Sequence, residues 1–548
     1  MEILMTKISK MLVHVLIIVA ILGAQVQGLA NCPQGCKCDD RTLVVNCGEG
    51  QLDVLPIALN PSIQRLVIKN NKIKTIDSSI QFYAELIYLD LSINHLFNIP
   101  GRTFYYQKKL EELHLNHNKI SSITNRTFVG LNSLTVLNLR GNFLDTIERG
   151  TFSALQKLEE LNLGQNRISR IDIGAFDGLP NLRVLVLDDN QLSAVPSEAL
   201  APLTNLAELF LGINSFRTIP TGAFQMLTRL TSLDLNGAAL LNISLGAFHG
   251  LENSLRQLQL SDNRLQRIPT IHMSELSRLE DLSLGQNDFE IIPEGAFVGL
   301  KNLRRLEISG SMHLRKIQAG AFATNTNLES IRIASNKMLT DVQEGALSGL
   351  PHLKHVILRD NALTTLDEGL FPWSELLTFD LSENPIVCDC RVLWLRNLLI
   401  MKNSSQLPND QQDNTIFCHA PERLRAEPLV AISPSLLGCS HSTSRRQAMF
   451  GTFLVGVAAT ITSLALLLYR YRRQIRAILK GRCTDSSPLG PKEREYQKSY
   501  YDEDSFLSRH TYAQATNQHP CNLAAHPTTL NHYYYTPIHR PCPPITEL

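Results

Sequence analysis

The chain has 548 residues, with 52 lysines and arginines against 51 aspartates and glutamates, so its formal net charge is +1. This length is ample for a large buried core. The near-neutral charge argues against nucleic acid as the main partner. Two apolar segments and 11 cysteines divide the chain into parts.

The first apolar segment, residues 11–22, follows Lys7 and Lys10 and precedes small residues. A basic start, a short apolar run and small residues near a cleavage point are typical of a secretory signal peptide. We therefore predict a signal peptide over residues 1–28, with cleavage after Gly28 or Ala30. The residues that follow would then enter an oxidising compartment.

A nine-residue pattern recurs after this segment: leucine, two variable residues, leucine, one variable residue, leucine, two variable residues and asparagine. There are 14 copies, 23–25 residues apart, and the step is 24 residues in eight of 13 cases. This period and pattern indicate a leucine-rich-repeat solenoid. The last positions are Asn71, Asn94, Asn118, Asn142, Asn166, Asn190, Asn214, Ala238, Asn263, Asn287, Ser311, Asn336, Asn361 and Asn384.

Each repeat should supply one short strand, because its leucines alternate with polar residues. One repeat cannot bury its apolar residues alone, so the repeats stack. We predict a parallel β-sheet horseshoe of the α/β class over residues 61–384. The asparagine amide would bond backbone groups where the buried chain leaves the strand. Ala238 and Ser311 interrupt this series, which either reflects tolerated variation or marks a local change of curvature.

Eight cysteines lie between the two apolar segments, in two groups of four. An even number in an oxidising compartment predicts two disulfides in each group, although the first group's spacing would also suit a zinc site. A solenoid needs units that cover the apolar core at its ends. We therefore predict an N-terminal cap over residues 31–60 and a C-terminal cap over residues 385–440. Four cysteines allow three connectivities, and the sequence does not choose among them.

The second apolar segment, residues 448–469, has 22 residues without a charge, which is long enough to span a membrane. Six basic residues follow it within 13 positions, whereas only Arg445 and Arg446 precede it closely. A buried core helix is the alternative, but it does not account for this basic cluster. The charge bias predicts a single-pass type I protein of the plasma membrane, with its N-terminus extracellular.

Residues 470–548 are rich in Tyr, His, Pro, Thr and Asn and lack apolar periodicity, so we predict a disordered cytoplasmic tail. Its histidines are too widely spaced to predict a metal site. The segment from Tyr535 to Ile538 resembles a tyrosine-based endocytic signal. Thr546 and Leu548 suit a PDZ domain, which binds a chain terminus as an added strand. Both short motifs also arise by chance.

Both cysteine groups resemble the flanking caps of extracellular leucine-rich-repeat proteins. The first is Cys32-x3-Cys36-x-Cys38-x8-Cys47. The second begins with Asn384 and Pro385 and continues with Cys388, Asp389, Cys390, Trp394, Leu395, Cys418 and Cys439. The resemblance implies that the first cysteine of each cap pairs with the third and the second with the fourth. The implied pairs are Cys32 with Cys38, Cys36 with Cys47, Cys388 with Cys418, and Cys390 with Cys439.

The order of parts resembles the insect Capricious and Tartan group of cell-surface recognition proteins. This resemblance rests on architecture and repeat number. It implies cell–cell adhesion and recognition of targets or boundaries during development. Toll-type receptors share the caps, but their signalling domain needs far more than the 79 residues that follow Tyr469.

Strand residues that alternate with the buried leucines should face the concave side of the solenoid. Apolar residues gather there at Val184, Val186 and Phe210, between Glu160 and Glu208. An apolar centre with a charged rim is typical of a protein interface, but scattered exposed apolar residues are also ordinary. The predicted partner-binding residues are Tyr88, His114, Val136, Glu160, Val184, Val186, Glu208 and Phe210.

Three sequons predict N-glycosylation of Asn125, Asn242 and Asn403. We expect the first two on the turn after a strand, where a glycan would leave the concave side open.

The sequence has no metal-ligand helix motif, nucleophile elbow or phosphate loop, so we predict neither an enzyme nor a cofactor. We expect a cell-surface recognition or adhesion receptor. Its repeats would bind another cell-surface or secreted protein, or a second copy of the chain, and a PDZ protein would bind the tail. The alternative is an immune or growth-factor type of receptor or co-receptor that signals through its tail.

Overall fold

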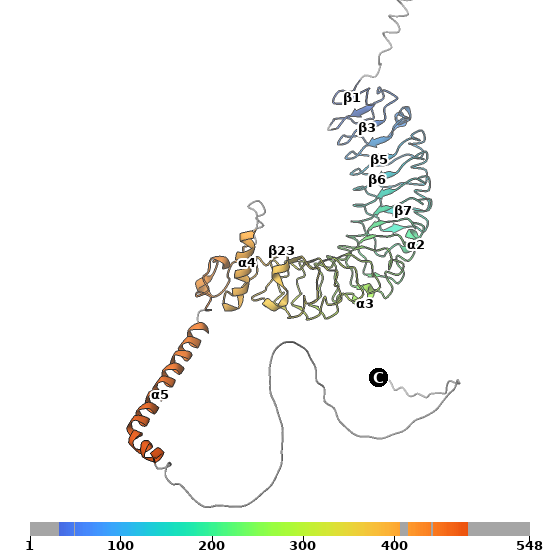
Figure 1. The fold of residues 1–548 in the computed structure, drawn as a ribbon. Helices are drawn as coiled ribbons and strands as arrows, with labels where there is room; N and C mark the ends of the chain where they lie inside the picture. The colour runs from blue at the N-terminus through green and yellow to red at the C-terminus, as the bar shows by residue number, and fades with distance from the viewer. Residues whose placement is uncertain (1–31, 49, 406–414, 440–441, 481–548) are drawn as a thin grey trace, which may run out of the picture. The chain divides into compact units, whose positions relative to one another are not determined.

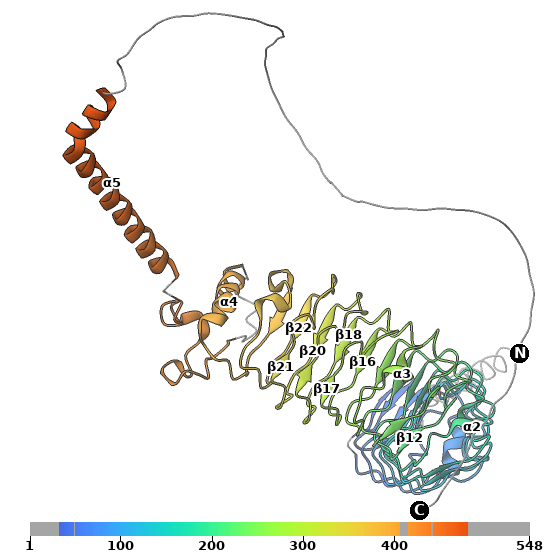
Figure 2. The ribbon, with the colours of Figure 1, turned by 90° about the horizontal axis from the view of Figure 1, so that it is seen from below.

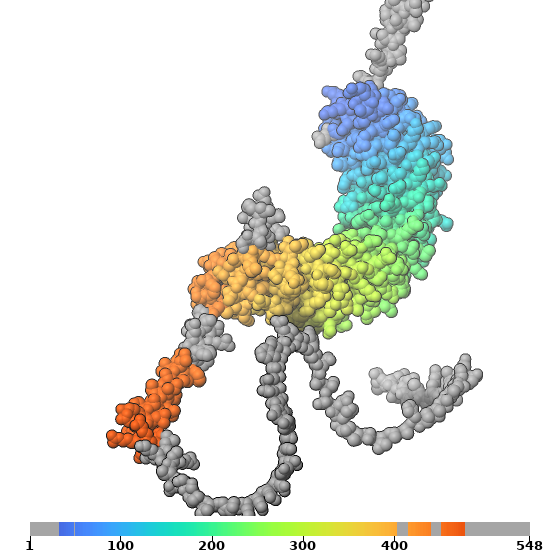
Figure 3. Space-filling model, in the orientation of Figure 1, coloured from blue at the N-terminus to red at the C-terminus, as the bar shows by residue number. Residues whose placement is uncertain are grey.

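The computed structural model describes residues 32–48, 50–405, 415–439 and 442–480. The predicted signal peptide and the tail residues Tyr535, Ile538, Thr546 and Leu548 lie outside the described residues. The repeats form a curved leucine-rich-repeat solenoid, which confirms the predicted fold class (Figure 1). A space-filling view shows these repeats stacked without a break (Figure 3).

One sheet of 16 strands runs along the inner side of the curve (Figures 1 and 2). Each repeat contributes one parallel strand of three residues, whose central residue is a buried apolar side chain. The strands are β3 (Arg65–Val67), β4 (Tyr88–Asp90), β5 (Glu112–His114), β6 (Val136–Asn138), β8 (Glu160–Asn162), β10 (Val184–Val186), β11 (Glu208–Phe210), β13 (Ser232–Asp234), β15 (Gln257–Gln259), β16 (Asp281–Ser283), β18 (Arg305–Glu307), β20 (Ser330–Arg332), β22 (His355–Ile357) and β23 (Thr378–Asp380).

The outer side of the solenoid is made of turns, short sheets and two short helices. Aromatic rings stack beneath it from repeat to repeat, as in Phe128, Phe152 and Phe176, whose centroids are 6.0 and 6.1 Å apart. The outer elements are β7 (Thr146–Ile147) with β9 (Arg170–Ile171), β12 (Thr218–Ile219) with β14 (Asn242–Ile243), the sheet of β17 (Ile291–Ile292), β19 (Lys316–Ile317) and β21 (Asp341–Val342), and helices α2 (Ser197–Leu200) and α3 (Thr270–Met273).

The repeat asparagines join each repeat to the one before it. Nδ2 of Asn166 donates to the carbonyl oxygens of Leu139, Leu163 and Gly164 at 3.0–3.1 Å. Its Oδ1 accepts from the backbone N–H of Leu144 at 3.1 Å. Leu139 and Leu144 belong to the preceding repeat, so one buried amide bonds backbone groups of two repeats. The side chains of Ala238 and Ser311 do not replace these bonds, and the Ser311 hydroxyl is buried without a partner.

Two disulfides hold each cap. They join Cys32 to Cys38, Cys36 to Cys47, Cys388 to Cys418 and Cys390 to Cys439, which is the pairing that the resemblance implied. The N-terminal cap adds β1 (Lys37–Asp39) and β2 (Val44–Asn46) to the main sheet. In the C-terminal cap, α4 (Leu393–Ser405) places Trp394 against Trp373, with ring centroids 5.4 Å apart. Trp373 lies shortly before β23, the strand of the last repeat, and Trp394 is partly buried against the hydrophobic core at this end of the solenoid.

The described residues also include six short 3-10 helices. Two are near the last repeats, three are in the C-terminal cap, and one precedes β4. They are η1 (Ser78–Phe82), η2 (Glu368–Leu370), η3 (Trp373–Glu375), η4 (Cys390–Val392), η5 (Glu422–Leu424) and η6 (Leu429–Ala431).

Helix α5 (Ser442–Lys480) contains the second apolar segment. In the described part of the chain, its window Gly451–Arg470 is the one stretch long and apolar enough to cross a membrane, with a mean hydropathy of 2.0. The prediction of a disordered tail from residue 470 was wrong at its start, because the helix continues to Lys480. The arginine, alanine, isoleucine and leucine residues after Tyr469 are compatible with a helix. The guanidinium carbon of Arg472 also lies 4.2 Å from the centroid of the Tyr469 ring.

The hydrogen bonds of the repeat asparagines allow a direct test of how the repeats are held together. We expect Asn166→Ala to lower the free energy of unfolding by about 1–3 kcal/mol, because backbone groups lose their buried partners. Asn132 is an exposed matched control, and Asn132→Ala should change stability little. Urea unfolding of residues 31–440 of each variant measures the difference. Equal losses at both positions would contradict the role assigned to Asn166.

The caps allow a second test, because their disulfides close loops of different lengths. Cys390 and Cys439 are separated by 49 residues, and Cys32 and Cys38 by six. Loop-closure entropy predicts that replacing both cysteines by serine costs about 4 kcal/mol for the long loop and about 2 kcal/mol for the short one. Thermal unfolding and the amount of protein delivered to the cell surface measure the effect. A larger loss at the Cys32 pair would contradict this order.

Candidate partner-binding surface

Three positions of every repeat form the concave surface: the first and third residues of the strand, and the residue after the third leucine. In β10, Val184 and Val186 are half-buried while Leu185 between them is fully buried. All eight predicted partner-binding residues occupy first or third strand positions in β4 to β11. The structure therefore places each of them on the concave surface, although it does not bring all of them together.

Val184, Val186 and Phe210 form one apolar patch. Strands β10 and β11 are parallel neighbours, with Val186 opposite Phe210. All three side chains are half-buried, so their bodies rest on neighbouring residues while one face reaches solvent. Such side chains lose little conformational freedom when a partner covers them, which favours an interface.

Acidic and apolar residues alternate beside this patch. Along the first strand position the register places Val136 between Glu112 and Glu160, and Val184 between Glu160 and Glu208. Neighbouring strands are about 4.8 Å apart, so successive glutamates of this row lie about 10 Å apart. The strand register therefore places Glu160 and Glu208 on either side of Val184.

Tyr88 and His114 form a separate group nearer the N-terminal cap. The guanidinium carbon of Arg65 lies 3.4 Å from the centroid of the Tyr88 ring, and the rings of Tyr88 and His114 are 5.1 Å apart. Nε2 of His114 lies 3.2 Å from Oε2 of Glu112. Burial raises the pKa of the Tyr88 phenol, and the nearby Asp90 carboxylate adds to this. Strands β6 and β8 lie between this group and the apolar patch.

The third concave position was missed by the sequence analysis, and it carries an ion pair across two repeats. Nη1 and Nη2 of Arg140 lie 2.8 and 3.0 Å from Oδ1 and Oδ2 of Asp188. The pair passes over Gly164 of the repeat between them, where a Cβ would collide with both side chains. The signal was present in the sequence, because Arg140, Gly164 and Asp188 occupy equivalent positions 24 residues apart.

Asp234 borders the patch on its C-terminal side, opposite Phe210 in β11. Burial raises the pKa of its carboxyl. The backbone N–H of Asn236, which donates to Oδ1 at 2.8 Å, lowers the pKa, and the Asp188 charge raises it. A carboxylate in this setting is poorly hydrated and would gain from a cation brought by a partner.

The C-terminal half of the concave surface is polar and internally paired. Asp281 pairs with Arg305, and Glu307 pairs with Arg332 at 3.2 Å. These side chains, with Ser283, line a shallow hollow across β15 to β20. Surface ion pairs of this kind contribute little stability, but they leave few charges for a partner to compensate.

Two of the predicted glycosylation sites lie away from the concave strands. Asn125 is exposed on an outer turn, as expected. Asn242 is also exposed, but the expectation of a turn was wrong, because it begins β14 on the outer side. Asn403 lies in α4, and its side chain is outside those described. A glycan on Asn125 or Asn242 would leave the concave surface open.

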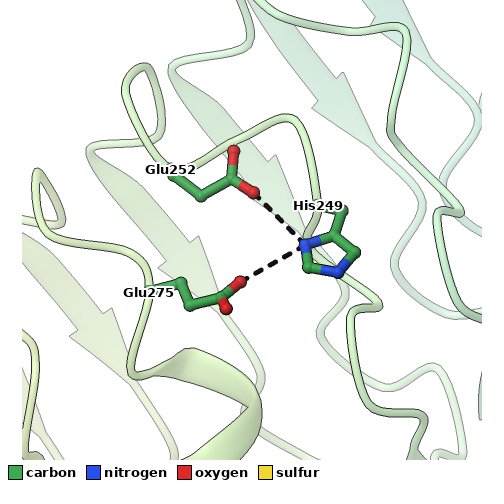
Figure 4. A group of neighbouring side chains, drawn as sticks. All are labelled: His249, Glu252 and Glu275. Carbon is green, nitrogen blue, oxygen red and sulfur yellow. Dashed lines mark hydrogen bonds and ion pairs between the residues drawn. The ribbon is translucent and has the colours of Figure 1, made fainter. Parts of the chain in front are cut away.

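One group of side chains in the described residues has the composition of a metal site (Figure 4). Nδ1 of His249 lies 3.3 Å from a carboxylate oxygen of Glu252 and 3.3 Å from one of Glu275. His249 and Glu275 are exposed and Glu252 is half-buried. The contact between His249 and Glu275 links the outer segments of two successive repeats at the surface.

Comparisons with known proteins agree with the fold. The family model described as leucine rich repeat matches residues 84–144, 133–192, 180–240, 204–254 and 253–312. A model described as BspA type leucine rich repeat region matches residues 290–389. The repeats, the disulfides and these matches together identify the chain as a leucine-rich-repeat protein with disulfide-bonded caps.

Similar proteins include one that is named receptor-like. The chain is 36% identical over 83 residues to Reticulon-4 receptor-like 2 of Homo sapiens, and 35% identical over 83 residues to the Rattus norvegicus protein. Each match covers 15% of this chain and spans only 20% of the curated relative.

Two solved structures share the fold. A complex of TLR13 with ssRNA13 has a TM-score of 0.52 and 25% identity, covering 69% of this chain and 61% of that one. A leucine-rich-repeat protein of Leptospira interrogans has a TM-score of 0.53 and 26% identity, covering 64% of this chain and 92% of that one.

Proposed function

We propose that this chain is a cell-surface recognition protein that binds another protein through its concave surface. The apolar patch of Val184, Val186 and Phe210 carries the proposal. Contiguous apolar side chains on a mostly polar surface mark sites of protein association. Their place on adjacent strands of a rigid sheet gives a partner a preformed site.

The chemistry of the ends supports an extracellular position for the repeats. Four disulfides persist in oxidising compartments and are rare in the cytosol. The basic residues after the Gly451–Arg470 window fit the cytoplasmic side of a membrane. Together these features favour a single-pass type I protein with its solenoid outside the cell.

The kind of recognition follows from resemblance. Architecture and repeat number resemble the Capricious and Tartan group, which implies adhesion or target recognition during development. The relatives that are named receptor-like support a role in binding at the cell surface. Within this proposal the chain acts by association alone and carries out no catalysis.

A protein partner is favoured over nucleic acid, although the TLR13 structure is a complex with ssRNA13. Nucleic-acid affinity depends on lysine and arginine side chains that neutralise phosphates. The centre of this concave surface instead presents Glu112, Glu160 and Glu208 at regular intervals. A phosphate backbone would be repelled there.

Charge placed in the patch tests the function. We expect Phe210→Asp and Val186→Asp each to weaken partner binding at least tenfold, because an unpaired carboxylate is costly to bury in an interface. Ile357→Asp, at the third position of β22 in the C-terminal half, is the matched control. Cells displaying the full chain are stained with a panel of purified extracellular domains, the chain's own included. Loss at Ile357 with retention at Phe210 would move the site to the C-terminal half.

Tag accessibility tests the orientation. A tag inserted after residue 31 should stain on intact cells, because the caps and repeats would lie outside. A tag after Leu548 should stain only after the membrane is permeabilised. The reverse pattern would contradict the proposed topology and the use of the concave surface as a cell-surface site.

A further inference from the structure

The two halves of the concave surface differ in charge. At the three concave positions of the repeats that contain β15 to β23, there are as many arginines as acidic residues. In the repeats that contain β4 to β13, a single arginine, Arg140, faces six acidic residues, whereas the first repeat, which contains β3, presents Arg65 and Lys69. These acidic residues are Asp90, Glu112, Glu160, Asp188, Glu208 and Asp234.

Ion pairs within the chain increase this difference in charge between the two halves. In the C-terminal half, arginines pair with acidic residues of neighbouring repeats, as Arg305 does with Asp281 and Arg332 with Glu307. In the N-terminal half, Arg140 is already held by Asp188. Glu160 and Glu208 form no ion pair within the described residues. Their charges therefore face solvent on either side of Val184.

The arrangement is specific as well as acidic. Glu160, Val184 and Glu208 occupy the same position of three adjacent strands, so the two carboxylates stand about 10 Å apart with an apolar side chain between them. Val186 and Phe210 widen the apolar centre along the strand direction. A partner that covers this centre must also desolvate the two carboxylates, or supply cations to them.

We propose that the partner is a basic protein surface, in which an apolar anchor lies between lysine or arginine side chains about 10 Å apart. This inference rests on the proposed function. The apolar anchor would pack on Val184, Val186 and Phe210, while the cations would pair with Glu160 and Glu208. The acidic excess in the repeats that contain β4 to β13 would also steer such a partner during approach, and salt would weaken that steering.

The same geometry disfavours symmetric self-association through the patch. A two-fold contact places a surface against its own copy. If the two-fold axis runs along the strands through Val184, Glu160 of one copy meets Glu208 of the other, and like charges that face each other in an interface are unfavourable. We therefore expect a different protein, not a second copy of the chain, at this patch.

The experiment uses the full chain displayed on cells. The probes are purified, monomeric extracellular domains, one set with basic and one with acidic net charge, together with the chain's own residues 31–440. Binding of each probe is measured to wild type, to Phe210→Asp, and to a Glu160→Gln/Glu208→Gln variant. Glutamine has the shape of glutamate without its charge, and surface staining controls for delivery.

The matched control is a Glu294→Gln/Glu344→Gln variant, which removes the same charge from exposed positions of outer turns. We expect basic probes to bind wild type and to fail on Phe210→Asp. The association rate of those probes should fall at least tenfold in the Glu160/Glu208 variant, with a weaker dependence on salt. The control variant should behave as wild type.

The outcomes separate the two proposals. A probe that fails on Phe210→Asp but binds the Glu160/Glu208 variant at the wild-type rate overturns the basic-partner inference and leaves the proposed function standing. An acidic probe, or the chain's own domain, that depends on Phe210 also overturns the inference. Binding that survives Phe210→Asp in every case, or no binding by any probe, overturns the proposed function itself.

Discussion

The buried asparagine amide is the interaction on which the rest of this structure depends. A leucine core alone would let neighbouring repeats slide, because apolar contacts have little directional preference. The amide of Asn166 bonds backbone groups of its own repeat and of the preceding one. Repeated along the chain, these bonds set the register of the strands. The disulfide caps then protect the two ends of the core from water.

A fixed register turns a linear repeat into a two-dimensional surface. Residues 24 positions apart in the chain become neighbours on adjacent strands, as Val186 and Phe210 do. Residues 48 positions apart can also meet, as Arg140 and Asp188 do over Gly164. The backbone beneath is rigid, so the surface is preorganised, and a partner meets side chains that need little rearrangement.

Recognition at such a surface combines two physical effects with different ranges. The apolar patch acts only at contact, where removal of water from Val184, Val186 and Phe210 would supply affinity. The acidic residues around it would act over about 8 Å at physiological salt, where they would favour an approaching surface of positive charge. In the C-terminal half, Arg305 and Arg332 neutralise their acidic neighbours, so that region offers neither effect strongly.

The sequence by itself determined the repeats, the buried centre of every strand and the residues that face the concave side. These follow from a local period: leucine spacing decides which side chains are buried, whatever the neighbours do. Only the tertiary structure decided that Tyr88 stacks with Arg65, that Arg140 pairs with Asp188, and that α5 continues to Lys480. It also separated the predicted site into two groups. Such contacts depend on side-chain conformations and on which charged groups compete for one partner, and neither is encoded in the period of the repeat.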